Sequence, residues 1–144
     1  MKNTIDINFK YKKESLPFKK GSKVVYSPRI PVLIKDPNSG KLTSFTSEFI
    51  IDTGASISII NVKYKSFLES IEKFDELKVR YGAGKQKWLP VYKLIFLIKG
   101  TEIDVTVAYD KDLPFLLLGH YGFFENLSYQ LFDSSLKKSR LVKY

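Results

Sequence analysis

Hydrophobic and polar residues alternate along much of the chain, which is the pattern of half-buried β-strands. Alternation and short apolar runs together predict strands over residues 5–11, 23–26, 30–35, 42–49, 77–81, 88–98, 103–108 and 113–118. A lysine-rich loop is expected between the first two of these strands. Many short strands with a single helical segment indicate a mostly β, barrel-like domain.

Clusters of turn residues separate the predicted strands. Residues 36–40 (Asp-Pro-Asn-Ser-Gly) favour a hairpin turn, since proline presets φ and glycine tolerates positive φ. Residues 82–84 (Gly-Ala-Gly) join two strand-like arms and predict a tight hairpin end, and residues 99–102 predict a further turn.

The hydrophobic period changes after residue 60. Asn61 is a residue type that caps helices, and apolar residues then recur at spacings of three and four. They are Tyr64, Phe67, Leu68, Ile71 and Phe74. This spacing predicts an amphipathic helix of about three turns whose aromatic stripe packs into the core.

An acid stands in the middle of the apolar run at residues 49–60. Burial of an unpaired carboxylate costs several kcal/mol, so Asp52 is expected either to be heavily hydrogen-bonded or to be kept for chemistry. Gly54 permits close approach of backbone or substrate, and Thr53 supplies a hydroxyl. These neighbours favour the chemical role.

Two motifs together resemble the retropepsin-like (retroviral-type) aspartic proteases. The first is Asp52-Thr53-Gly54-Ala55-Ser56, which is similar to the active-site turn of that family. The second is the aliphatic run that ends in Leu117, Leu118 and Gly119. Their order and separation match the family, and the resemblance covers roughly residues 31–133. It implies a closed acid-protease-like β-barrel with one short helix and one lobe per chain.

The resemblance implies an aspartic endopeptidase with Asp52 as the catalytic residue. Thr53, Gly54, Ala55 and Ser56 would support the catalytic loop, and Gly119 would let the second motif pack behind it. Peptide hydrolysis of this kind needs two carboxylates, of which one takes a proton from water and the other donates a hydrogen bond to the carbonyl. Since the chain holds one Asp-Thr-Gly, the second Asp52 is expected from a homodimer.

The hairpin end between the motifs resembles the family's flap, which closes over the substrate. The residues that carry this resemblance are Tyr81, Gly82, Ala83, Gly84 and Lys85. An ordinary surface hairpin is the alternative. A nucleotide-binding fingerprint is disfavoured, because a third glycine and a following helix are lacking.

The chain departs from the retroviral pattern at two positions. His120 and Ser56 replace an arginine and an aspartate that pair in those enzymes, and Ser56 resembles the serine of pepsin-type turns that hydrogen-bonds the catalytic carboxylate. The dimer would then need other contacts, for which the segment around Tyr129, Leu131 and Phe132 is the candidate. A Ser-His-Asp triad through His120 is disfavoured, as no Gly-x-Ser-x-Gly elbow is present.

Composition and charge limit how many domains the chain can form and where its charge lies. A chain of 144 residues with 44% hydrophobic residues suits one domain. We divide it into a basic N-terminal segment with a strand (1–28), a protease domain (29–133) and a basic C-terminal tail (134–144). Of the net charge of +9, much lies in residues 1–25, which hold seven lysines and two acids. These ends are expected to be solvated, with acidic partners, acidic substrates or nucleic acid as alternatives.

Several function classes are excluded or disfavoured. Zero cysteines exclude disulfides and thiol catalysis, and a single histidine argues against a zinc cluster, so neither metal nor cofactor is expected. The sequence lacks an apolar run of membrane-spanning length and a signal-peptide core, which predicts a cytoplasmic protein. The expected partners are a second copy and a peptide or protein substrate, with nucleic acid disfavoured. The alternative function is a catalytically silent retropepsin-fold dimerisation or peptide-binding module.

Overall fold

The structure, a computed structural model, describes residues 5–81, 84–127, 129–133 and 138–143. Strands dominate the fold, and the α-helix α1 spans Lys65–Leu68. The strands of the barrel region are β4 (Arg29–Lys35), β5 (Ser47–Ile51), β6 (Ser58–Ile60), β7 (Asp75–Tyr81), β8 (Lys85–Ile98), β9 (Thr101–Tyr109) and β10 (Leu117–Leu118). The remaining strands are β1 (Ile5–Lys10), β2 (Lys12–Phe18), β3 (Gly21–Ser27), β11 (Tyr129–Asp133) and β12 (Lys138–Lys143).

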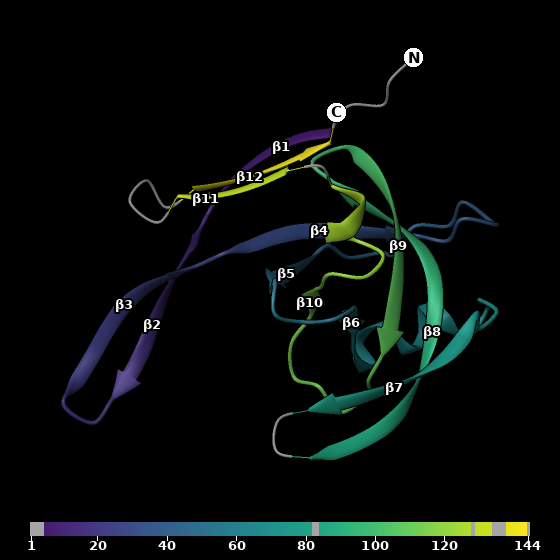
Figure 1. Cartoon of the computed structure of the whole chain (residues 1–144), viewed down its shortest axis with the longest axis horizontal. Helices are drawn as coiled ribbons and strands as arrows, with labels where there is room; N and C mark the ends of the chain where they lie inside the picture. The colour runs from purple at the N-terminus through teal and green to yellow at the C-terminus, as the bar shows by residue number, and fades with distance from the viewer. Residues whose placement is uncertain (1–4, 82–83, 128, 134–137, 144) are drawn as a thin grey trace.

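Six of these strands close into a barrel (Figure 1). They follow the order β4-β5-β10-β6-β9-β8, and β8 pairs back with β4 through Leu33 and Leu97. The strand β7 pairs with β8 outside this ring. The predicted mostly β barrel with one short helix is therefore confirmed.

The interior is filled by the alternating apolar residues of the strands. Val32, Ile34, Phe49 and Phe96 are fully buried in the main cluster. A second, smaller cluster contains Ile57, Ile59, Val79, Leu89, Val91, Ala108 and Leu117. Each large apolar side chain contributes about 1.5–3 kcal/mol on full burial, so these clusters are the main source of stability.

The two ends of the chain meet in one antiparallel sheet of order β1-β12-β11 (Figure 1). Ile7 and Leu141 are cross-strand partners in this sheet, and both are buried in the main cluster. The segment 134–144 was expected to be a solvated basic tail, but its residues 138–143 form the middle strand. The expectation is wrong for this strand, because Leu141, which lies among the basic residues, is buried in the main cluster.

Residues expected to form a lysine-rich loop instead form a strand. β2 pairs antiparallel with β3, and this hairpin extends away from the barrel (Figure 1). Phe18 and Val24 on the hairpin are more than half exposed. Since neither face of the hairpin is fully buried, β2 lacks the clean alternation that identifies a strand in a sequence.

The predicted helix forms only in part. The Asn61 side chain accepts a hydrogen bond of 3.1 Å from the Lys63 N–H, as expected of a cap, and opens a 3-10 turn (Val62–Tyr64) that leads into α1. The expected three turns are wrong, because helix α1 ends at Leu68. The Phe74 N–H donates to the Val91 carbonyl at 2.8 Å, and its ring is 54% exposed rather than in the core.

Candidate active site

Asp52 opens an exposed turn at the end of β5. Its carboxylate is half-buried, and Oδ1 accepts a hydrogen bond of 3.0 Å from the Gly54 N–H. The Ala55 N–H closes the turn by donating to the Asp52 carbonyl at 3.1 Å. Thr53, Gly54 and Ser56 are exposed. The acid therefore lies at the surface of the single chain. The apolar run had instead suggested a position inside a buried strand.

The short strand β10 supports the start of this turn. It lies between β5 and β6, parallel to the first and antiparallel to the second, so the chain that leaves β5 crosses the end of β10. The Ile50 N–H donates to the Leu116 carbonyl at 2.9 Å, and the Asp52 N–H donates to the Leu118 carbonyl at 3.0 Å. The second motif thus fixes the backbone on which Asp52 stands.

The residues after β10 support the end of the turn. The His120 N–H donates to the Ala55 carbonyl and the Tyr121 N–H to the Ser56 carbonyl, each at 2.8 Å. The Gly119 N–H donates to the hydroxyl oxygen of Ser58 at 2.9 Å. Both ends of the Asp52 turn are therefore hydrogen-bonded to the segment 116–121.

Ser58 was not singled out from the sequence, although it is fully buried beside the turn. A serine inside the run Ile-Ser-Ile-Ile is the signal that could have identified it. Ser56, by contrast, has an exposed side chain, and the hydrogen bonds of the described residues include none from its hydroxyl to Asp52. The contact implied by pepsin-type turns is therefore not made in the single chain.

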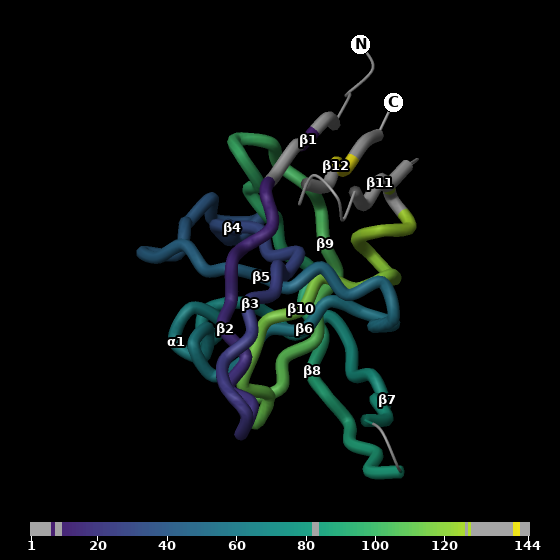
Figure 2. The backbone as a smooth tube through the Cα atoms, turned by 90° about the vertical axis from the view of Figure 1, so that its left-hand side faces the viewer, coloured from purple at the N-terminus to yellow at the C-terminus, as the bar shows by residue number. Residues whose placement is uncertain are grey.

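The hairpin of β7 and β8 projects beyond the barrel (Figure 2). Its arms pair from Asp75 and Val91 to Tyr81 and Lys85, next to the tip. Gly84 has a φ of 120°, which favours glycine. Gly82 and Ala83, predicted at the flap tip, lie outside the described residues.

The base of this hairpin and the Asp52 turn share one apolar cluster. Val79 and Leu89 from the hairpin are buried there with Ile57 from the far end of the turn. Ala55 from the turn and Tyr81 from the hairpin both pack against the same cluster. One face of the hairpin is therefore directed toward the side of the barrel that carries Asp52.

An ion pair connects the hairpin to the end of β9. The Lys87 Nζ lies 2.9 Å from Asp110 Oδ1 and 3.5 Å from Asp112 Oδ2, and the Asp110 side chain is 3% exposed. Burial alone would raise the pKa of Asp110, but hydrogen bonds from Lys87 and the Asp112 N–H hold it below its ordinary value. Burial, followed by the neighbouring Asp110, raises the pKa of Tyr81. The sequence does not reveal this network, because it depends on strand register.

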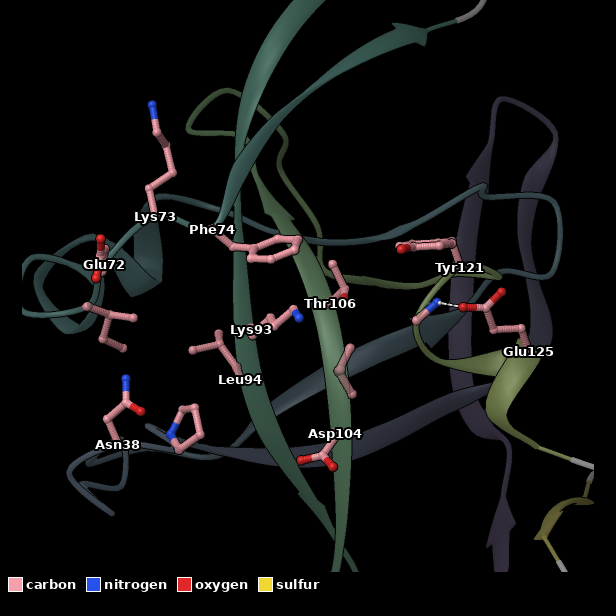
Figure 3. A pocket seen from close by; sticks show the side chains of 14 residues that line it. Asn38, Glu72, Lys73, Phe74, Lys93, Leu94, Asp104, Thr106, Tyr121 and Glu125 are labelled. Atoms are coloured by element: carbon pink, nitrogen blue, oxygen red, sulfur yellow. Dashed lines mark hydrogen bonds between the residues drawn. The ribbon is translucent and has the colours of Figure 1, made fainter.

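A separate groove of about 760 Å³ lies across β8 and β9 (Figure 3). Phe74 and Tyr121 stand on either side of Thr106, and the Lys93 Nζ lies 4.1 Å from the centroid of the Phe74 ring. Asp52 does not line this groove. The groove is therefore distinct from the candidate active site.

Two further features, a metal-binding cluster and a membrane-spanning helix, are absent from the described residues. Within these ranges, acids and His120 do not gather into a group of three or more that could hold a metal ion. The described helices include none long and apolar enough to cross a membrane.

Comparison with known proteins adds no family assignment: neither the protein-family models nor the curated proteins include a match to this chain. The functional interpretation therefore rests on the two motifs and on the geometry around Asp52.

Proposed function

We propose that the chain is one subunit of a dimeric, retropepsin-like aspartic endopeptidase. The observation that carries the proposal is the support of the Asp52 turn, which hydrogen-bonds to the segment 116–121 at both ends. Such support holds a carboxylate in position while leaving it partly exposed. Catalytic groups are held in their productive position by supporting hydrogen bonds of this kind.

The proposed chemistry uses Asp52 from each of two copies. One ionised carboxylate takes a proton from a water molecule as the water oxygen attacks the peptide carbonyl carbon, while the protonated carboxylic acid hydrogen-bonds to the carbonyl oxygen. Proton transfer to the amide nitrogen then accompanies cleavage of the C–N bond. Two ionised carboxylates about 4 Å apart repel by roughly 4 kcal/mol at an effective dielectric near 20, which favours a single shared proton.

Exposure around Asp52 supports the involvement of a second copy. Thr53 and Gly54 are exposed, so a two-fold axis beside them would bring the two turns together. Among the described strands β11 pairs only with β12, and its other edge is available for backbone pairing across that axis. The dimer contact suggested for residues 129–133 remains a proposal that fits this edge position.

The β7–β8 hairpin is the proposed cover for the substrate. It projects from the cluster that also contacts the Asp52 turn, so an extended peptide would lie between the two. Exclusion of water by such a cover strengthens the electrostatic interactions of the dyad.

The test compares the parent chain with Asp52→Asn on a diverse peptide mixture, with and without a statine-type inhibitor. Asn cannot take the proton from water, so cleavage should be lost while the folded structure is kept. Asp104→Asn is the matched control, since Asp104 is exposed on β9 and lines the separate groove that does not include Asp52. Cleavage by Asp52→Asn within a few fold of the parent would overturn the proposal. Peptide binding by the parent without cleavage would support the silent-module alternative.

A further inference from the structure

The face of the β7–β8 hairpin that is directed toward the site is identified by its register. Val79 pairs with Lys87 and Tyr81 pairs with Lys85. Directly opposed residues of an antiparallel pair lie on the same face, and residues two positions apart along a strand do so too. Because Val79 is buried in the cluster shared with the Asp52 turn, Tyr81, Lys85 and Lys87 belong to the inner face.

The opposite face of the hairpin is also basic, and its side chains are exposed, as Lys85 is. Lys78 pairs with Trp88, which is 64% exposed, and Arg80 is exposed as well. The Lys78 Nζ lies 5.9 Å from the Trp88 ring centroid. Lys78 and Lys85 are both exposed and lie on opposite faces of the hairpin, so Lys78 is the outer-face counterpart of Lys85.

The two inner lysines are not equivalent. Lys87 is neutralised by Asp110 and Asp112, and its Nζ also lies 5.5 Å from the Tyr81 ring centroid. Lys85 makes no ion pair with any of the described residues. It lines, with Tyr81, Gln86 and Lys87, a hollow of about 560 Å³. An uncompensated cation therefore stands on the inner face next to the hairpin tip.

We propose that Lys85 is a specificity-determining residue that binds an acidic side chain of the peptide substrate under the β7–β8 hairpin. This inference rests on the proposed endopeptidase function. A carboxylate offers the oxygen acceptors that an ammonium group binds with charge-assisted hydrogen bonds. The Lys87–Asp110 ion pair contributes to this binding indirectly, because it connects β8 to the end of β9. Since Lys87 is already paired, Lys85 is the cation that the substrate would contact. The excess positive charge of the chain would also attract acidic segments.

The experiment measures kcat/KM for matched peptides that carry Glu or Gln at one position, scanned along each side of the scissile bond. For the parent, Glu should be preferred about tenfold at one position, and added salt should reduce the preference. In Lys85→Gln the ratio should fall to about one, and Lys85→Glu should favour a Lys peptide instead. Lys78→Gln, the matched change on the outer face, should keep the Glu preference.

Four outcomes would contradict the role of Lys85, and the last of them would also contradict the endopeptidase proposal. Cleavage without a Glu preference at any position, or with a preference that persists in Lys85→Gln, would overturn the role of Lys85 and leave the endopeptidase proposal standing. Equal loss of the preference in Lys78→Gln and Lys85→Gln would also overturn it, since the effect would then be one of general charge. Absence of cleavage by the parent would overturn the endopeptidase proposal and, with it, this inference.

Discussion

Gly119 lies directly against the backbone of Ile57: a β-carbon at position 119 would come within 2.3 Å of the Ile57 carbonyl carbon. Real side chains essentially never approach a backbone atom so closely, so either β10 or the end of the Asp52 turn would have to move. The glycine is required here by close approach and not by its own backbone conformation. The position of Asp52 therefore depends on the close packing of the segment that ends in Gly119 against the Asp52 turn.

We expect Gly119→Ala to destabilise the fold by about 3 kcal/mol, the upper end of the usual cost of overpacking, because the clash is with backbone. Urea unfolding measures the loss. Gly54→Ala is the control, since its β-carbon would meet only the Asp52 carboxylate, at 3.3 Å. Equal unfolding free energies for Gly119→Ala and the parent would contradict the packing account.

Ser58→Ala should cost about 1–3 kcal/mol, because the buried Gly119 N–H would lose its acceptor. Ser56→Ala, two residues away and exposed, should change stability by less than about 0.5 kcal/mol. Thermal unfolding of both variants gives the comparison. A cost for Ser56→Ala as large as that for Ser58→Ala would show that the hydroxyl contact is not the cause.

Asp110 should contribute a pH-dependent share of the stability. Its pKa in the folded chain lies below the ordinary 3.8, so the unfolded chain binds the proton first as the pH falls. The stabilisation by Asp110 is therefore complete above pH 3.8, and it is lost as the pH falls through the lower pKa that Asp110 has in the folded chain. Asp110→Asn should be about 1–2 kcal/mol less stable at neutral pH, a modest cost because Lys87 is 37% exposed.

The difference between parent and Asp110→Asn should shrink as the pH falls below 3.8 and toward the lower pKa of the folded chain. Urea unfolding across this range measures it, with the exposed Asp104→Asn as control. A difference that stays constant with pH would mean that the ionised form of Asp110 is not what stabilises the fold.

Gly84→Val should reduce turnover more than it reduces stability. Gly84 has a φ of 120° with open space around it, so valine would strain the hairpin end by about 1–3 kcal/mol without a clash. Gly100→Val is the matched control, since Gly100 has a φ of 79° and similarly open surroundings in the turn between β8 and β9. Equal effects of the two variants on peptide cleavage would contradict a covering role for the β7–β8 hairpin.

The sequence predicted those features that depend on local pattern. The arms of the β7–β8 hairpin and most of β9 follow from alternation, because one face of each is buried in a cluster. The turn at Asp52 and the partner segment ending in Gly119 follow from their motifs. Closure of the barrel was expected only through the resemblance, since no local pattern encodes the pairing of Leu33 with Leu97.

Features that depend on distant partners were missed. The spacing of Ile71 and Phe74 is helical, yet the Phe74 N–H is taken by the Val91 carbonyl, and tertiary pairing outweighs the helical pattern. The Lys87–Asp110 pair joins residues on different elements and becomes visible only once the register is known. Strand β2 was missed because its side chains are largely exposed on both faces.

The central claim is that two copies of Asp52 form one catalytic site, and it is tested most directly by specific activity across a dilution series. Each sample is also examined by analytical sedimentation, so that the fraction of dimer is known. One subunit holds one Asp52, so specific activity should fall in proportion to the dimer fraction, as the monomer lacks the second acid. A species that sediments as a monomer and keeps full specific activity would contradict the account.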